Sequence, residues 1–108
     1  MKIIIYGKNI ELTDSIKIYV NDKVGSTAKM LSDKDDKLAE ARVEVGLPSK
    51  HHKSGEVFYA EINLSIGSKL FRANEKHIDL HSAIVQSVDE LKRQLRKERD
   101  KELSKRRP

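Results

Sequence analysis

Two stretches of alternating apolar and polar residues constrain the fold of this chain more than any other feature. A period of two is the pattern of a strand with one buried face, so both stretches predict strands. The polar segment Pro48–Gly55 predicts a turn between them. Gly67-Ser68 predicts a two-residue hairpin into a third strand over residues 69–73. The expected core residues are Ala39, Ala41, Val43, Val45 and Leu47 in residues 38–47, and Phe58, Ala60, Ile62, Leu64 and Ile66 in residues 56–66.

Two other segments have helical spacing. The first follows Thr13, a good N-cap, and Gly25 inside it weakens the helix by up to about 1 kcal/mol. Residues 32–36 end it. The second helix follows the cap Asp79; continued to Leu103 it is about 36 Å long, so its last turns project beyond a small sheet. The apolar stripes are Ile16, Val20, Val24, Ala28 and Leu31, then Leu80, Ile84, Val88, Leu91 and Leu95.

The order of elements predicts one α+β domain. Three consecutive Ile residues in Lys2–Tyr6 favour a first strand buried on both sides. The result is β-α-β-β-β-α, a four-stranded sheet with two helices packed on one face, similar to double-stranded RNA-binding domains. A chain of 108 residues supports one core. We assign residues 1–95 to the domain and residues 96–108 to a basic C-terminal helical extension or tail.

Composition excludes several classes of protein. The chain has no cysteine, which excludes disulfides and zinc-thiolate sites. No apolar run approaches the roughly 20 residues that cross a bilayer, and the N-terminus lacks the features of a signal peptide. We therefore expect a cytoplasmic monomer with no membrane contact and no cofactor.

The positive charge is concentrated at the C-terminal end. Residues 92–108 carry nine basic and three acidic side chains, whereas the first 91 residues carry 13 basic and 14 acidic ones. Such a block indicates a polyanionic partner, most often nucleic acid. The residues that we expect to bind RNA lie off the apolar stripes, where two neighbouring helices could merge their cations into one surface. They are Lys23, Lys29, Arg93, Arg96, Lys97 and Lys101.

Catalytic and metal-binding patterns are weak. His77 and His81 have the i, i+4 spacing of a helical metal site, but His77 precedes the cap and no third ligand stands at a familiar interval. The serines form no nucleophile motif, and the glycines form no phosphate loop. Glu40, Glu44 and Glu61 share the polar face of the sheet, where cross-strand ion pairs with neighbouring basic residues explain them. We expect neither an enzyme nor a metal site.

Three motifs resemble the ribosome hibernation-promoting factors, also called ribosome-associated inhibitor or sigma-54 modulation proteins. They are the opening segment 5–13, IYGKNIELT, the helix start 79–84, DLHSAI, and the helix segment 91–97, LKRQLRK. The resemblance implies a non-catalytic factor that binds the small ribosomal subunit through its rRNA and its proteins. Such a factor occupies the mRNA/tRNA channel at the A and P sites, competes with tRNA and mRNA, and inhibits translation in stress or stationary phase.

The resemblance also implies site residues. Position by position, the contacts carried over are Lys23, Lys29, Arg93, Lys97 and Lys101. This chain departs from the family pattern at Ser26 and Glu90, where basic residues are common, and at His81, where Tyr is usual. The family's long forms add a second domain after a linker, so the resemblance here is to a short form. The basic ending favours the type that permits ribosome dimers.

Two alternatives from other classes stay open. A general double-stranded RNA-binding module would bind a plain RNA duplex as well as it binds small subunits. An interaction protein with an acidic protein partner would be captured in a nuclease-insensitive complex. A third interpretation assigns the charged helix no binding role. Its charged residues would then form a solvent-exposed face with i, i+4 ion pairs such as Arg96–Asp100.

Overall fold

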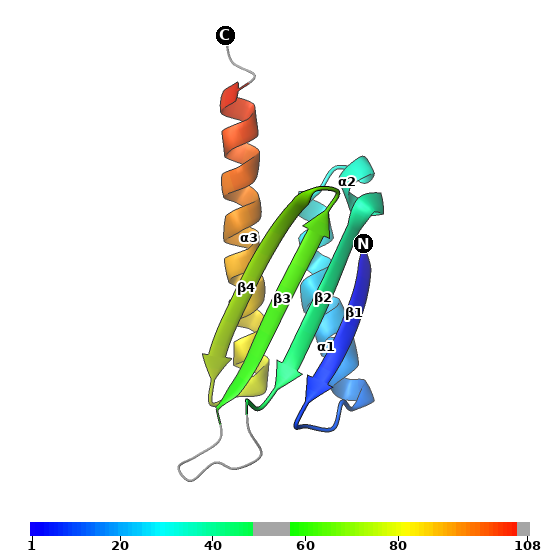
Figure 1. Cartoon of the computed structure of the whole chain (residues 1–108), viewed down its shortest axis with the longest axis vertical. Coiled ribbons are helices and arrows are strands. Elements are labelled where there is room, and N and C mark those ends of the chain that lie inside the picture. Colours follow the sequence, from blue (N-terminus) through cyan, green and yellow to red (C-terminus); the bar gives the residue numbers. More distant parts are fainter. Residues whose placement is uncertain (49–56, 106–108) are drawn as a thin grey trace.

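The structure confirms the predicted α+β class and element order (Figure 1). It is a computed structural model that describes residues 1–48 and 57–105, so most of the turn expected at Pro48–Gly55 lies outside the described residues. The elements are β1 (Lys2–Lys8), α1 (Asp14–Gly25), the 3₁₀ helix η1 (Ser26–Met30), α2 (Asp33–Leu38), β2 (Ala39–Gly46), β3 (Phe58–Ile66), β4 (Lys69–His77) and α3 (Leu80–Lys105).

The four strands form one mixed sheet in the order β1-β2-β3-β4, with α1 and α3 on the same face (Figure 1). β1 runs parallel to β2, and the other neighbours are antiparallel. The register puts Val43 opposite Ile62 and Ile62 opposite Ala73, so the predicted apolar faces of the strands meet in one core. β4 extends to His77, four residues beyond the predicted strand.

The prediction for the first strand is wrong in one respect, because β1 is not buried on both sides. β1 is an edge strand, and the helices cover only one face of the sheet (Figure 1). Ile3 and Ile5 pack against the core, whereas Ile4 pairs with Arg42 on the uncovered face and Tyr6 is 49% exposed. A run of β-branched residues indicates a strand, but it does not reveal how many layers cover that strand.

The first helix begins as predicted and ends earlier. Thr13 Oγ1 accepts a hydrogen bond from the Ile16 amide at 3.2 Å, which satisfies one of the free donors of the first turn. The α-helix ends at Gly25 and the chain continues as η1, so Lys29 belongs to the 3₁₀ turn. The segment expected only to end the helix instead starts α2, whose first turn is capped by Ser32 Oγ accepting from the Asp35 amide at 3.1 Å.

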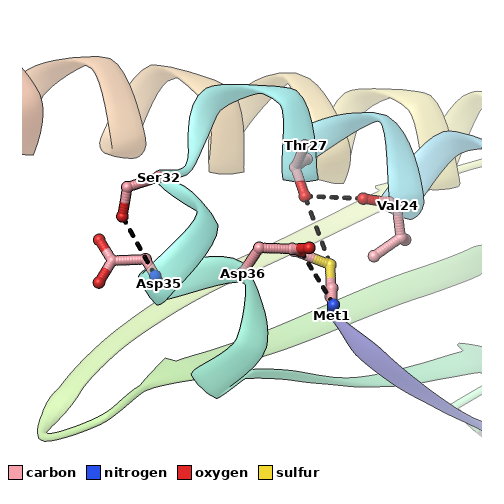
Figure 2. A network of polar contacts seen from close by, with 6 residues as sticks. All are labelled: Met1, Val24, Thr27, Ser32, Asp35 and Asp36. Carbon is pink, nitrogen blue, oxygen red and sulfur yellow. Dashed lines mark hydrogen bonds and ion pairs between the residues drawn. The ribbon is translucent and has the colours of Figure 1, made fainter.

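A small polar network ties the N-terminal end of β1 to η1 and α2 (Figure 2). The α-ammonium group of Met1 lies 2.9 Å from Asp36 Oδ1. The buried Thr27 hydroxyl donates to the Val24 carbonyl at 2.7 Å and lies 3.8 Å from the Met1 sulfur. The network holds the edge strand against the helical layer at the end of the sheet where β1 begins.

α3 has the predicted cap and the predicted buried stripe. Asp79 Oδ2 accepts from the Ser82 amide at 3.2 Å, and every residue of the stripe from Leu80 to Leu95 is buried. The buried Ser87 hydroxyl donates to the Ala60 carbonyl of β3 at 2.6 Å, which anchors the helix to the sheet. With 26 residues α3 is about 39 Å long, and its last turns stand beyond the end of the sheet (Figure 1). Among the described residues, no helix combines the length and apolar character that a bilayer crossing requires.

Candidate RNA-binding surface

The six residues predicted to bind RNA lie on the helical layer, in three elements. Lys23 is half-buried on α1, Lys29 is exposed on η1, and the remaining four are exposed on α3. The α3 residues are exposed because the core stripe occupies the opposite side of the helix, and Arg93 is about 200° around the helix from Leu91. The α3 members of the set are Arg93, Arg96, Lys97 and Lys101.

One groove brings a predicted residue together with a lysine outside the predicted set. Lys23 of α1 and Lys92 of α3 line the groove between the two helices, over Val85 and Val88. Asp22 and Asp89 also line it, and Asp22 lies 4.0 Å from Lys23 Nζ. The Lys23 ammonium also lies 5.5 Å from the centre of the Tyr19 ring, a cation–π contact. The groove therefore holds two lysines, and the two aspartates partly offset their positive charge.

Arg93 lies on the other flank of α3 and does not share that groove. It lines a shallow hollow with Arg96, Gln86, Glu90 and Glu75, and Glu75 belongs to β4. The helical repeat of 3.6 residues puts Lys97 and Lys101 on the same flank as Arg93. The four predicted cations of α3 thus spread around its exposed side instead of merging with Lys23 into one groove.

The Arg93 guanidinium is engaged by a carboxylate of its own helix. Arg93 Nε and a terminal nitrogen donate to the two Glu90 oxygens at 2.8 and 2.7 Å. This bidentate pair, together with a hydrogen bond from Gln94, lowers the pKa of Glu90 to about 2. The charge of Arg93 is thus partly offset within its own helix.

Lys92 and Arg99 are basic residues of α3 that the predicted set omits. Arg99 lines a cleft with Met30 and Leu31, so it lies on the flank of α3 that faces η1. On a helical wheel both side chains lie at the edge of the apolar stripe, because Lys92 follows Val88 and Arg99 follows Leu95 by four residues. Only the packing of α1 and η1 against α3 shows which flank they occupy, and no sequence signal gives that rotation.

The histidines make local contacts. His77 Nδ1 accepts from the Asp79 amide at 3.0 Å at the end of β4. The His81 ring meets the Tyr19 ring edge-on at 4.4 Å between centroids, across the interface of α1 and α3. In residues 1–48 and 57–105, no three His, Cys, Asp or Glu side chains gather as a metal-ligand set. His51 and His52 lie outside the described residues.

The carboxylates on the uncovered face of the sheet differ from the expected cross-strand ion pairs. Glu40 pairs with Arg42 along the same strand, at 3.3 Å. Glu44 lies directly opposite Glu61 in the register, and Asn63 donates to Glu61 at 3.4 Å. Burial, and then the neighbouring Glu44, raises the pKa of the Tyr59 hydroxyl. Like charges opposite each other are unfavourable in a sheet, so the part of this face around Glu44 and Glu61 is poorly suited to a polyanion.

Fold and charge together define a small α+β domain whose helical layer carries an excess of cations, the kind of surface that attracts polyanions. A family model described as "Sigma 54 modulation protein / S30EA ribosomal protein" matches residues 3–102. The chain therefore belongs to this family, which confirms the resemblance seen in the three motifs. It is a family of non-catalytic ribosome hibernation factors, in agreement with the expectation that the protein is not an enzyme.

Curated relatives carry the name ribosome hibernation promotion factor. That of Deinococcus radiodurans is 30% identical over 91 residues, which cover 84% of this chain and 45% of the relative. That of Lactococcus lactis subsp. cremoris is 32% identical over 97 residues, which cover 90% and 49%. The chain spans about half the length of these relatives.

Solved structures show the same fold. The N-terminal domain of Thermus thermophilus Protein Y superposes with a TM-score of 0.74 at 30% identity, covering 90% of this chain and 98% of that domain. A ribosomal subunit interface protein from Coxiella burnetii gives a TM-score of 0.72 at 12% identity, covering 93% of this chain and 99% of that protein. At 12% identity the likeness shows the fold alone.

Proposed function

We propose that this protein binds the small ribosomal subunit and inhibits translation by occupying the channel for mRNA and for the tRNAs of the A and P sites. It acts in the cytoplasm during stress or stationary phase, as a monomer, without catalysing a reaction. The observation that carries the proposal is the family match over residues 3–102, together with relatives that are named ribosome hibernation promotion factors.

The charge distribution supports rRNA as the main partner. The exposed cations of α1, η1 and α3 lie on the helical layer, and most of them belong to α3. Each cation that neutralises a phosphate releases a condensed counterion, so binding of this kind weakens steeply as salt rises. tRNA and mRNA cannot approach rRNA phosphates that the protein covers. The protein therefore inhibits translation by competing with tRNA and mRNA for the same site.

The direct test is co-sedimentation with purified small subunits across a salt series, with and without tRNA. We expect binding to saturate near one protein per subunit and to be displaced by tRNA. Binding to bulk RNA alone, indifferent to tRNA, would contradict the proposal and favour the general double-stranded RNA-binding module.

Charge reversal tests the surface itself. The variant R93E/K97E/K101E should lose subunit binding, and its salt slope should fall by about 3 if each side chain contacts one phosphate. The matched control is K2E/K8E/K76E, which changes the net charge equally at exposed positions of β1 and β4. If both variants lost the same affinity for small subunits, net charge alone would explain the effect, and the assignment of the binding surface to α3 would be wrong.

A further inference from the structure

The last turns of α3 do not pack on the hydrophobic core, but one residue of the sheet forms ion pairs with them. Leu95 is the last buried residue of the helix, and residues 99–105 are exposed. Lys69, the first residue of β4, places its Nζ atom 3.1 Å from Glu98 Oε1 and also pairs with Glu102 Oε1. One ammonium group therefore bridges two carboxylates that are one turn apart on α3.

The position of Lys69 suits this bridge. It directly follows the Gly67-Ser68 hairpin, at the end of the sheet beyond which α3 continues (Figure 1). The three charged side chains line one cleft together with the apolar residues Ile66, Phe71 and Leu95. The hydrogen bonds to Glu102 and Glu98 raise the pKa of Lys69, which agrees with the close contact of the three groups.

The bridge also changes the charge that the projecting helix presents. Residues 96–105 contain three acids, Glu98, Asp100 and Glu102, and Lys69 offsets two of them. Both lie on the sheet-facing side of α3. Four cations of the same turns stand about 60° or more around the helix from both acids, whereas Lys105 follows Glu102 by three residues and shares their side. The four are Arg96, Lys97, Arg99 and Lys101.

We infer that Lys69 is a positioning residue for RNA binding: it fixes the projecting end of α3 to the sheet and offsets the two acids on its inner side, so that a straight, cationic helix meets the RNA. The inference rests on the proposed function. A helix end without tertiary contacts frays, because only its own hydrogen bonds hold it. An exposed ion pair adds little to global stability, so the role of Lys69 lies in the order and charge of this end.

The first experiment compares Lys69→Met with Lys76→Met in binding to small subunits. Both lysines are exposed on β4, but Lys76 forms no ion pair within the described part of the chain, so its replacement removes the same charge without opening the bridge. We expect K69M to weaken binding about fivefold and K76M by less than about twofold. Equal effects of K69M and K76M would overturn the inference while leaving the proposed function intact.

A double-mutant cycle separates positioning from direct contact with RNA. In the background E98Q/E102Q the bridge is already broken, so K69M should change binding by less than about twofold. If Lys69 contacted RNA directly, K69M would cost the same in both backgrounds, and the positioning role would be wrong. K69R should keep wild-type binding, because its guanidinium can bridge the same two carboxylates.

Hydrogen exchange tests the bridge without the ribosome. Amides of residues 99–105 should exchange about tenfold faster in K69M than in wild type or K76M, and amides of the buried part of α3 should not change. Unchanged exchange in K69M would overturn the positioning role. Failure of the wild type to bind small subunits would instead overturn the proposed function, whatever the exchange data show about the bridge.

Discussion

Glu90 and Arg93 lie one turn apart on α3, and their ion pair shows that a count of basic residues overstates the available charge. Both guanidinium–carboxylate distances are below 3 Å, at 2.8 and 2.7 Å. The sequence shows Arg93 as one of a regular series of cations. The structure shows that the charge of Arg93 is partly neutralised by Glu90 of the same helix. Lys97 and Lys101 are therefore the stronger candidates for RNA binding on that flank of α3.

The same pair predicts a pH dependence. The carboxyl of Glu90 should titrate near pH 2 in wild type and closer to its ordinary 4.5 in Arg93→Met. Because the folded pKa is lowered, the pair stabilises the fold above pH 4.5, and this stability is lost as the pH falls from 4.5 toward 2. Carbon NMR of the Glu90 carboxyl measures the pKa directly. A wild-type value near 4.5 would show that the pair does not persist in solution.

At the scale of elements, Gly25 marks where α1 gives way to η1. The expectation of a weak point at Gly25 agrees with the end of the α-helix there. The apolar stripe nevertheless continues across the change of helix type, because Val24, Met30 and Leu31 pack in or against the core. Helix type over residues 26–30 is therefore decided by packing as well as by local preference.

Gly25→Ala should stabilise the protein by about 0.5–1 kcal/mol, since alanine reduces the entropy of the unfolded chain. An added Cβ would meet only Ile3 Cδ1, at 3.8 Å, an ordinary contact. Gly46→Ala is the opposite control, because its Cβ would lie 1.9 Å from the Lys8 carbonyl oxygen and force β1 away from β2. Urea denaturation measures both. A loss of stability in Gly25→Ala would mean that the turn from α1 into η1 needs glycine.

At the scale of the whole molecule, the buried residues of α3 and most of its basic residues lie in different parts of the helix. Every buried core residue lies at or before Leu95, whereas five basic residues lie within 96–105. The assignment of residues 96–108 to a basic extension stays a prediction. The continuous helix through Lys105 and the bridge from Lys69 show that the described part of this segment is attached to the sheet.

A chain shortened to end at Lys97 tests that assignment. It keeps the turn that carries Leu95, so we expect cooperative unfolding with a loss of about 1 kcal/mol or less, the value of the exposed ion pairs removed. Its affinity for small subunits should fall at least about tenfold, because Arg99, Lys101 and Lys105 are gone. Circular dichroism and co-sedimentation measure the two properties. An unfolded product would place the extension within the folding unit.

Much of the fold could be predicted because its signals are local. The alternation in residues 38–66, the hairpin at Gly67-Ser68 and the caps Thr13 and Asp79 all agree with the structure over the described residues. The short helix α2 was missed because its six residues contain one apolar side chain, too few for a periodic signal. The single-sided burial of β1 was missed because β-branched runs are equally compatible with a central and an edge strand.

By itself the sequence determined the four strands, the two long helices, the apolar faces of all of these except β1, and the concentration of charge near the C-terminus, because periodicity and composition are properties of neighbouring residues. Only the tertiary structure decided which flank of α3 faces α1 and η1, and so placed Lys92 beside Lys23 and Arg99 beside Met30. It alone brought Lys69 to Glu98 and Glu102, about 30 residues further along the chain. Such relations depend on how packed elements are rotated against one another, which no local pattern encodes.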